Sequence, residues 1–161
     1  MTMMLAMNRS LLRCRSTIIL LAALALLVGC EGKAPSGLAT VPMEIGSKTF
    51  TLEVADRTDS RTYGLMRRDT LAKDHGMIFV FDSEEPRGFW MKNCRFPLDI
   101  LFLDAGGKIV SIKQMKAYDL SSTPSDGPAQ YAIELNEGAA EAAGVKAGMT
   151  LKLPKGLSSK D

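Results

Sequence analysis

Residues 88–103 hold the densest group of side chains that could do chemistry. The segment reads GFWMKNCRFPLDILFL and contains Trp90, the only tryptophan of the chain. Strand alternation over residues 88–93 would put Trp90 and Lys92 on one face and Asn93 on the other. An aromatic ring beside an amine and an amide suits a pocket for a sugar or another polar ligand. The alternative is that Trp90 anchors the core while Lys92 and Asn93 belong to a turn.

Asp99 is the most unexpected residue, because it interrupts the run LDILFL, in which both faces of a strand look apolar. A buried carboxylate without a partner is costly, so Asp99 needs either an ion pair or a raised pKa. The candidate partners are Lys92, Arg95 and Arg61. The alternative is a structural role, as a buried ion pair or as the cap of its own turn after Pro97. The candidate ligand-binding set is Trp90, Lys92, Asn93 and Asp99.

Other chemistries have less support. Cys94 and His75 are the only cysteine and histidine after residue 30, and no third group can be named to orient them as a nucleophilic pair. They cannot supply the usual zinc ligands, and the methionines lack the tight repeat of a copper site. An Asp99–Glu134 pair could in principle hydrolyse a glycosidic bond. No phosphate loop, nucleophile elbow or dinucleotide fingerprint is present. The sequence therefore predicts no metal and no cofactor.

Hydrophobic periodicity predicts a mainly β domain. Residues 48–55 alternate as a half-buried strand, and GMIFVF (76–81) reads as a strand buried on both faces. Further strands are expected at 88–93, 98–103, 108–115, 129–135 and 149–153. Short helices are expected from Thr58 to about Gly64 and over residues 137–143. Seven or eight short strands with two short helices indicate a compact sandwich or partly open barrel over residues 41–154, followed by a polar tail at 155–161.

The N-terminal segment has the pattern of a secretory signal peptide. Residues 1–29 contain three arginines and no acidic residue, and Ile18–Val28 is an unbroken apolar run of 11 residues. A membrane-spanning helix needs about 20 apolar residues, so this run is too short. The formal charge of +2 comes from this leader, because the remainder of the chain has a net charge of −1. Nucleic acid is therefore not an expected partner.

The leader ends in Leu-Val-Gly-Cys, which resembles the lipobox of bacterial lipoproteins. This resemblance implies that Cys30 becomes the first mature residue and carries lipid, which would anchor the protein to a membrane. Residues 31–40 (EGKAPSGLAT) then form a flexible tether. Glu31 lacks the Asp that retains enteric lipoproteins in the inner membrane. The expected location is the cell envelope, facing the periplasm and leaning to the outer membrane.

The domain itself resembles the domain-of-unknown-function 192 family of bacterial and archaeal proteins. The matching segments are LEVADRTDSRTYGLMRR (52–68), residues 75–112, GPAQYAIELNEG (127–138) and AGVKAGM (143–149). The resemblance implies a compact, mainly β fold, often secreted or tethered, with no established activity. Cys94 stands where the family usually has Thr. The family's recurrent polar positions correspond here to Glu53, Arg61, Lys92, Asn93, Asp99 and Glu134.

These observations predict an uncharacterised lipid-anchored protein of the cell envelope, with a non-catalytic domain that binds a small polar ligand or an envelope protein. The candidate supporting polar network is Glu53, Arg61 and Glu134. The alternatives are a carboxylate-dependent hydrolase acting on envelope glycans and a purely structural envelope module. The expected partners are the membrane, through the lipid on Cys30, and the ligand or envelope protein.

Overall fold

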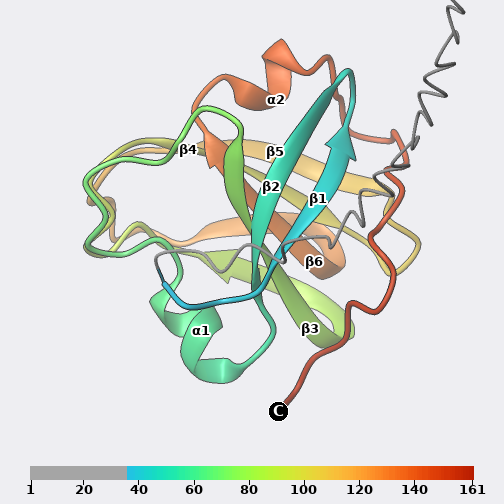
Figure 1. The fold of residues 1–161 in the computed structure, drawn as a ribbon, viewed down its shortest axis with the longest axis horizontal. Helices are drawn as coiled ribbons and strands as arrows, with labels where there is room; N and C mark the ends of the chain where they lie inside the picture. Colours follow the sequence, from blue (N-terminus) through green and yellow to red (C-terminus); the bar gives the residue numbers. More distant parts are fainter. Residues whose placement is uncertain (1–35) are drawn as a thin grey trace, which may run out of the picture.

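The structure is a computed structural model that describes residues 36–161 (Figure 1). The leader and Cys30 lie outside the described residues. Six strands form one open mixed sheet, and two short helices accompany it, which confirms the predicted mainly β fold. The elements are β1 (Thr40–Ile45), β2 (Lys48–Ala55), α1 (Thr58–Tyr63), β3 (His75–Phe89), β4 (Leu98–Leu103), β5 (Ile109–Met115), β6 (Thr123–Asn136) and α2 (Ala139–Ala142).

The strand order is β1-β2-β3-β6-β4-β5. Strands β2 and β3 are parallel and are connected through α1, whereas all other neighbouring pairs are antiparallel. The long strands β3 and β6 pair in two stretches separated by bulges, the main shift falling between Val80 and Glu85. Because bulges bend a strand, the outer halves of β3 and β6 turn away from the main sheet. The central strand β4 is buried along its whole length, so apolar side chains must be covered on both faces of the sheet.

Each face of the sheet carries its own apolar cluster. One cluster includes Leu101, Ile133 and Leu135, and it is covered by α2 and the segment around Leu151. The other includes Phe79, Phe102 and Met91, and it is covered by the loops that follow α1 and β3. Because β3 and β4 are central and buried on both sides, their sequences read as continuous apolar runs rather than alternating ones.

Two expected strands, 88–93 and 149–153, do not form, and one that was not expected, β1, does, so the sheet has six strands instead of seven or eight. β3 continues from His75 through to Phe89, and the chain then leaves the sheet. The Cys94 amide donates to the Met91 carbonyl at 3.1 Å, which closes a turn where a strand over 88–93 was expected. Residues 149–153 contribute a single bridge, Thr150 to Lys108, instead of a strand.

The segments that flank the expected domain also pack on it. The Leu38 side chain lies against the Phe79 cluster, and the Ala39 carbonyl accepts a hydrogen bond from the Val54 amide at 2.9 Å. In the C-terminal tail, Asp161 pairs with Arg61, and the Lys160 amide donates to the Asp56 carbonyl at 2.8 Å. Within residues 36–161, no helix is long and apolar enough to cross a membrane.

Candidate functional site

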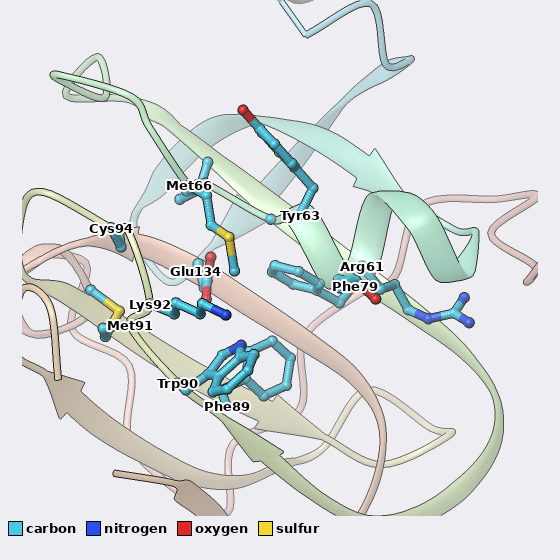
Figure 2. A pocket seen from close by; sticks show the side chains of 13 residues that line it. Arg61, Tyr63, Met66, Phe79, Phe89, Trp90, Met91, Lys92, Cys94 and Glu134 are labelled. Carbon is cyan, nitrogen blue, oxygen red and sulfur yellow. The ribbon is translucent and has the colours of Figure 1, made fainter. Parts of the chain in front are cut away.

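A narrow pocket opens on the Phe79 face of the sheet, between the loop after α1 and the loop after β3 (Figure 2). About 30 Å³ of it is open to the centre of a water-sized sphere, which is room for one or two water molecules. Aromatic and sulfur-containing side chains line most of it, and the charged groups are few. The principal lining residues are Tyr63, Met66, Phe79, Phe89, Trp90, Met91, Lys92, Cys94 and Glu134.

The sheet register places Glu134 at the floor of this pocket. Glu134 lies between Ile133 and Leu135 on β6, and both of these neighbours point to the opposite face. Across the sheet, Glu53, Met77 and Glu134 lie opposite one another on β2, β3 and β6. Residues in register on adjacent strands share a face, so the two glutamates point to the same side about 10 Å apart.

Glu134 is a buried acid without a hydrogen-bond partner in the described part of the chain. Only 5% of the residue is exposed. No hydrogen bond to its carboxyl group is found within residues 36–161. Since no fully enclosed side-chain oxygen or nitrogen of these residues lacks a partner, the Glu134 oxygens border the open space of the pocket. Burial raises the pKa of Glu134 to about 8, and the positive charge of Arg68 opposes this rise only in part. At neutral pH the group is therefore mostly an uncharged carboxylic acid, able both to donate and to accept a hydrogen bond.

Glu53, the second acid of this row, is fully paired. The Arg68 guanidinium donates two parallel hydrogen bonds to the Glu53 carboxylate, Nη1 to Oε1 at 2.5 Å and Nη2 to Oε2 at 2.7 Å. The Ser36 hydroxyl also donates to Oε2. Burial by itself raises the pKa of Glu53, but the bonds from Arg68 and Ser36 outweigh it and hold this pKa below its ordinary value. Glu53 is thus held as a charged group by Arg68, and the same Arg68 charge also acts on Glu134.

Trp90 and Lys92 stand at the mouth of the pocket. The Lys92 ammonium lies 5.2 Å from the centroid of the Trp90 ring, within cation–π range. Lys92 makes no salt bridge with any acid of residues 36–161. Both residues also line a wider groove that continues outward from the pocket past Tyr63, Arg67 and Asn93. The mouth therefore offers a free positive charge and a half-exposed aromatic ring.

Three loops around this mouth are bonded to one another through their backbones. These are residues 63–67, 90–94 and 116–120, here called the mouth loops. The Arg67 amide donates to the Asn93 carbonyl at 2.8 Å, the Tyr118 amide to Cys94 at 3.0 Å, and the Met91 amide to Asp119 at 2.8 Å. Each loop carries one residue with a left-handed backbone: Arg67 (φ 61°), Asn93 (φ 58°) and Tyr118 (φ 61°). These are the only non-glycine residues with positive φ in residues 36–161, and such strain concentrates at functional sites.

The structure separates Asp99 from the other candidate ligand-binding residues. Its carboxylate accepts a hydrogen bond from the Ala140 amide at 3.0 Å, so it satisfies the first turn of α2. Asp99 shares its face of the sheet with Leu101, whereas Glu134 faces the other way. The Asp99–Glu134 pair considered for glycoside hydrolysis thus lies on opposite sides of the sheet and cannot act on one bond. None of the basic partners considered for Asp99 forms an ion pair with it.

Arg61 and Asn93 take different places. In Figure 2 the Arg61 guanidinium points away from the pocket, and its Nη1 donates to the Val80 carbonyl at 3.0 Å. The hydrogen bonds of Arg61 to Asp161 and Thr58 attach the C-terminal tail to α1. Asn93 lies in the outer groove and supplies the backbone carbonyl that Arg67 uses. Of the expected polar network, Glu53 and Glu134 share one face, and Arg61 does not join them.

Cys94 lines the pocket as a buried thiol. It is 4% exposed, and its Sγ lies 3.7 Å from the Phe96 carbonyl oxygen. Burial raises the pKa of this thiol, and the nearby Glu134 raises it further. A thiol that resists ionisation is a poor nucleophile and a poor metal ligand. Within the described range, no three His, Cys, Asp or Glu side chains gather closely enough to hold a metal ion.

Reasoning from the sequence missed the importance of Arg68, Tyr63 and Met66. Arg68 belongs to the segment 52–68 that carries the family resemblance. Its pairing with Glu53 depends on how the connection from β2 through α1 to β3 folds back over the sheet, which the local sequence pattern does not predict. Tyr63 and Met66 come from the end of α1 and the turn after it, where a short helix gives no clear amphipathic stripe. A signal that could have pointed to Glu134 is the run AIEL, in which an acid interrupts apolar residues as it does in LDILFL.

The fold and the site define a small domain built on one mixed sheet. Its pocket is bordered by loops and lined by one acidic residue, Glu134. The chain belongs to the domain-of-unknown-function 192 family (DUF192), described as "Uncharacterized ACR", whose model matches residues 41–153.

Two solved structures are similar over most of the domain. One is a protein of unknown function from Novosphingobium aromaticivorans DSM 12444, with 30% identity and a TM-score of 0.69 over 76% of this chain and 91% of that one. The other is described as a "putative transcription regulator" from Sinorhizobium meliloti 1021, with 34% identity and a TM-score of 0.63 over 74% of this chain and 87% of that one. No curated protein is significantly similar in sequence.

Proposed function

We propose that this domain is a non-catalytic binding module of the cell envelope whose pocket takes a small polar ligand over Glu134. The observation that carries the proposal is the Glu134 carboxyl group, which is on a buried residue, lines the pocket and has no hydrogen-bond partner within residues 36–161. Its hydrogen-bonding capacity is therefore left for a molecule in the pocket.

The groups around the pocket favour a ligand that brings hydrogen-bond acceptors. An uncharged Glu134 donates a proton from its carboxyl group, and the Lys92 ammonium donates from the mouth. A carboxylate is a small group that accepts hydrogen bonds from both. The remainder of the ligand would lie in the outer groove against the Trp90 ring, as sugars and other flat polar molecules do.

A thermal-shift screen on residues 31–161 tests this proposal. Small carboxylates, acidic and neutral sugars, amino acids and peptidoglycan fragments are the probes. A ligand at 100 times its Kd adds about 2.7 kcal/mol, which raises the Tm of a domain of this size by roughly 8 °C. We expect Trp90→Ala to abolish the shift and Lys92→Met to reduce it, whereas Lys48→Met, an exposed lysine on β2, leaves it unchanged. A flat screen, or a shift indifferent to Trp90→Ala, contradicts the proposal.

The proposed location rests on the leader and the lipobox, which lie outside the described residues. Lipid on Cys30 would hold the domain at the membrane surface, facing the periplasm and leaning to the outer membrane. Labelling of cells with radioactive palmitate should mark the full chain, and Cys30→Ala should remove the label and release the protein in soluble form. Fractionation of inner and outer membranes then gives the location. An unlabelled wild-type protein contradicts the proposed anchor.

Nucleic acid is not part of this proposal. The description of the Sinorhizobium protein names a role in transcription, but DNA-binding proteins neutralise phosphates with clustered Lys and Arg. After residue 29 this chain carries a net charge of −1. An export signal would also separate the protein from the chromosome.

A further inference from the structure

The mouth loops carry most of the exposed large apolar side chains in residues 36–161. The structure exposes five such residues: Tyr63 (54%), Trp90 (49%), Tyr118 (60%), Leu120 (68%) and Met149 (43%). All except Met149 belong to the mouth loops. We call these four residues the aromatic rim. Their loops are joined by the backbone hydrogen bonds described above, so the four residues lie on neighbouring loops around one pocket mouth. Exposed apolar residues that gather in this way mark an interaction surface.

The rim has the composition of a membrane-interface surface. Trp and Tyr prefer the headgroup level of a bilayer, because one side of each ring is apolar and the other can hydrogen-bond. The mouth loops also carry Arg67, Lys92 and Lys116 against a single acid, Asp119, a formal charge of +2. Such a charge suits the anionic headgroups of a bacterial membrane.

The path of the chain brings this surface toward the proposed anchor. Ser36 and Leu38 share a surface groove with Tyr63, and Figure 1 shows the described chain beginning beside α1. Cys30 lies six residues before Ser36, so the two Cα atoms are at most about 22 Å apart. A domain of this length is about 35 Å across. A lipid on Cys30 therefore cannot reach a bilayer on the far side of the domain.

We propose that the aromatic rim docks on the membrane surface when the protein is anchored through Cys30, so that the pocket mouth opens at the headgroup layer. This inference rests on the proposed lipid anchor. The bilayer is favoured over a protein partner because the short anchor, which enters the domain beside Tyr63, keeps the rim within reach of the membrane. Trp90 and Tyr118 would lie among headgroups, and Lys92 and Arg67 would contact lipid phosphates.

The lone tryptophan makes the test direct, because Trp90 is both a rim residue and the only indole reporter. Residues 30–161 with Cys94→Thr retain one thiol, Cys30, which is coupled to a maleimide lipid in vesicles of phosphatidylethanolamine and phosphatidylglycerol. Lipids brominated near the headgroup quench tryptophan on contact. Since tryptophan settles at headgroup level, we expect about twofold quenching of Trp90, together with protection from aqueous acrylamide.

Two matched variants separate rim docking from simple proximity. Tyr118→Ser with Leu120→Ser removes apolar rim surface and should abolish most of the quenching. Met149→Ser removes an exposed methionine that packs near Ile109, at the opposite end of β5 from the rim, and should leave quenching unchanged. No quenching by brominated lipid, or equal quenching in both variants, overturns the proposal. Protection of Trp90 only after addition of an envelope protein extract also overturns it and assigns the rim to a protein.

Because the coupling is chemical, this result does not depend on whether cells acylate Cys30 or whether the pocket binds a carboxylate. Palmitate labelling and the thermal-shift screen test those two points separately.

Discussion

Glu134 should make the stability of the domain depend on pH in a specific direction. Its ordinary pKa is 4.5, and burial raises it to about 8 in the folded protein. The folded state therefore holds this proton more tightly than the unfolded state does. Stability from this group is complete below pH 4.5 and is lost as the pH rises through about 8. Each pH unit within this window lowers the free energy of unfolding by about 1.4 kcal/mol.

The substitution that isolates this effect is Glu134→Gln, which keeps the shape of the side chain but cannot ionise. The full change from pH 4.5 to about 8 corresponds to about 5 kcal/mol. This loss should be present in the wild type and absent in the variant, so the variant should be the more stable protein by several kcal/mol at pH 8. Urea unfolding between pH 5 and 8.5, followed by Trp90 fluorescence, measures both proteins.

The difference between wild type and variant cancels the contributions of groups that do not interact with Glu134. Glu137→Gln serves as the matched control, because Glu137 is exposed and lies three residues further along the chain. Its stability should follow the wild type at every pH. A wild-type minus Glu134→Gln difference that stays flat between pH 5 and 8 would refute the argument that the pocket floor holds a neutral acid.

Other predictions follow from the same geometry. Asp99→Ala should lower the free energy of unfolding by about 2 kcal/mol, because a backbone amide of α2 loses its acceptor; ligand-induced thermal shifts should persist, and their loss would place Asp99 in the binding site after all. Arg68→Met should cost about 3 kcal/mol in urea unfolding, since Glu53 keeps a buried charge without its partner. The same variant should move the Glu134 titration to higher pH in carboxyl NMR spectra, because Arg68 lowers that pKa; an unmoved titration would show that Arg68 does not act on the pocket.

The sequence was informative about elements and less so about their partners. Alternation in residues 48–55 and the apolar runs of 76–81 and 98–103 each predicted a strand that the structure contains, because local pattern reports burial directly. The extension of β3 to Phe89 was not predictable, since DSEEPRGF has no strand pattern and pairs with β6 only around a bulge. The strand ends before Trp90, and the chain then turns through Asn93, whose backbone is left-handed. The alternating side chains of residues 88–93 are compatible with either a strand or this turn, so the sequence did not distinguish them.

The two interior acids show how far residue type alone can guide a search for function. Asp99 and Glu134 both interrupt apolar strands. The register between β4 and β6 places them on opposite faces of the sheet. Asp99 points to the face where the amide at the start of α2 donates to it, while Glu134 points to the face where Trp90 and Lys92 border an open pocket. Buried polar groups are almost always satisfied within a protein. Glu134, by contrast, has no partner within residues 36–161 and lies beneath the three mouth loops, each of which carries a left-handed residue, so the position is better explained by a ligand than by packing.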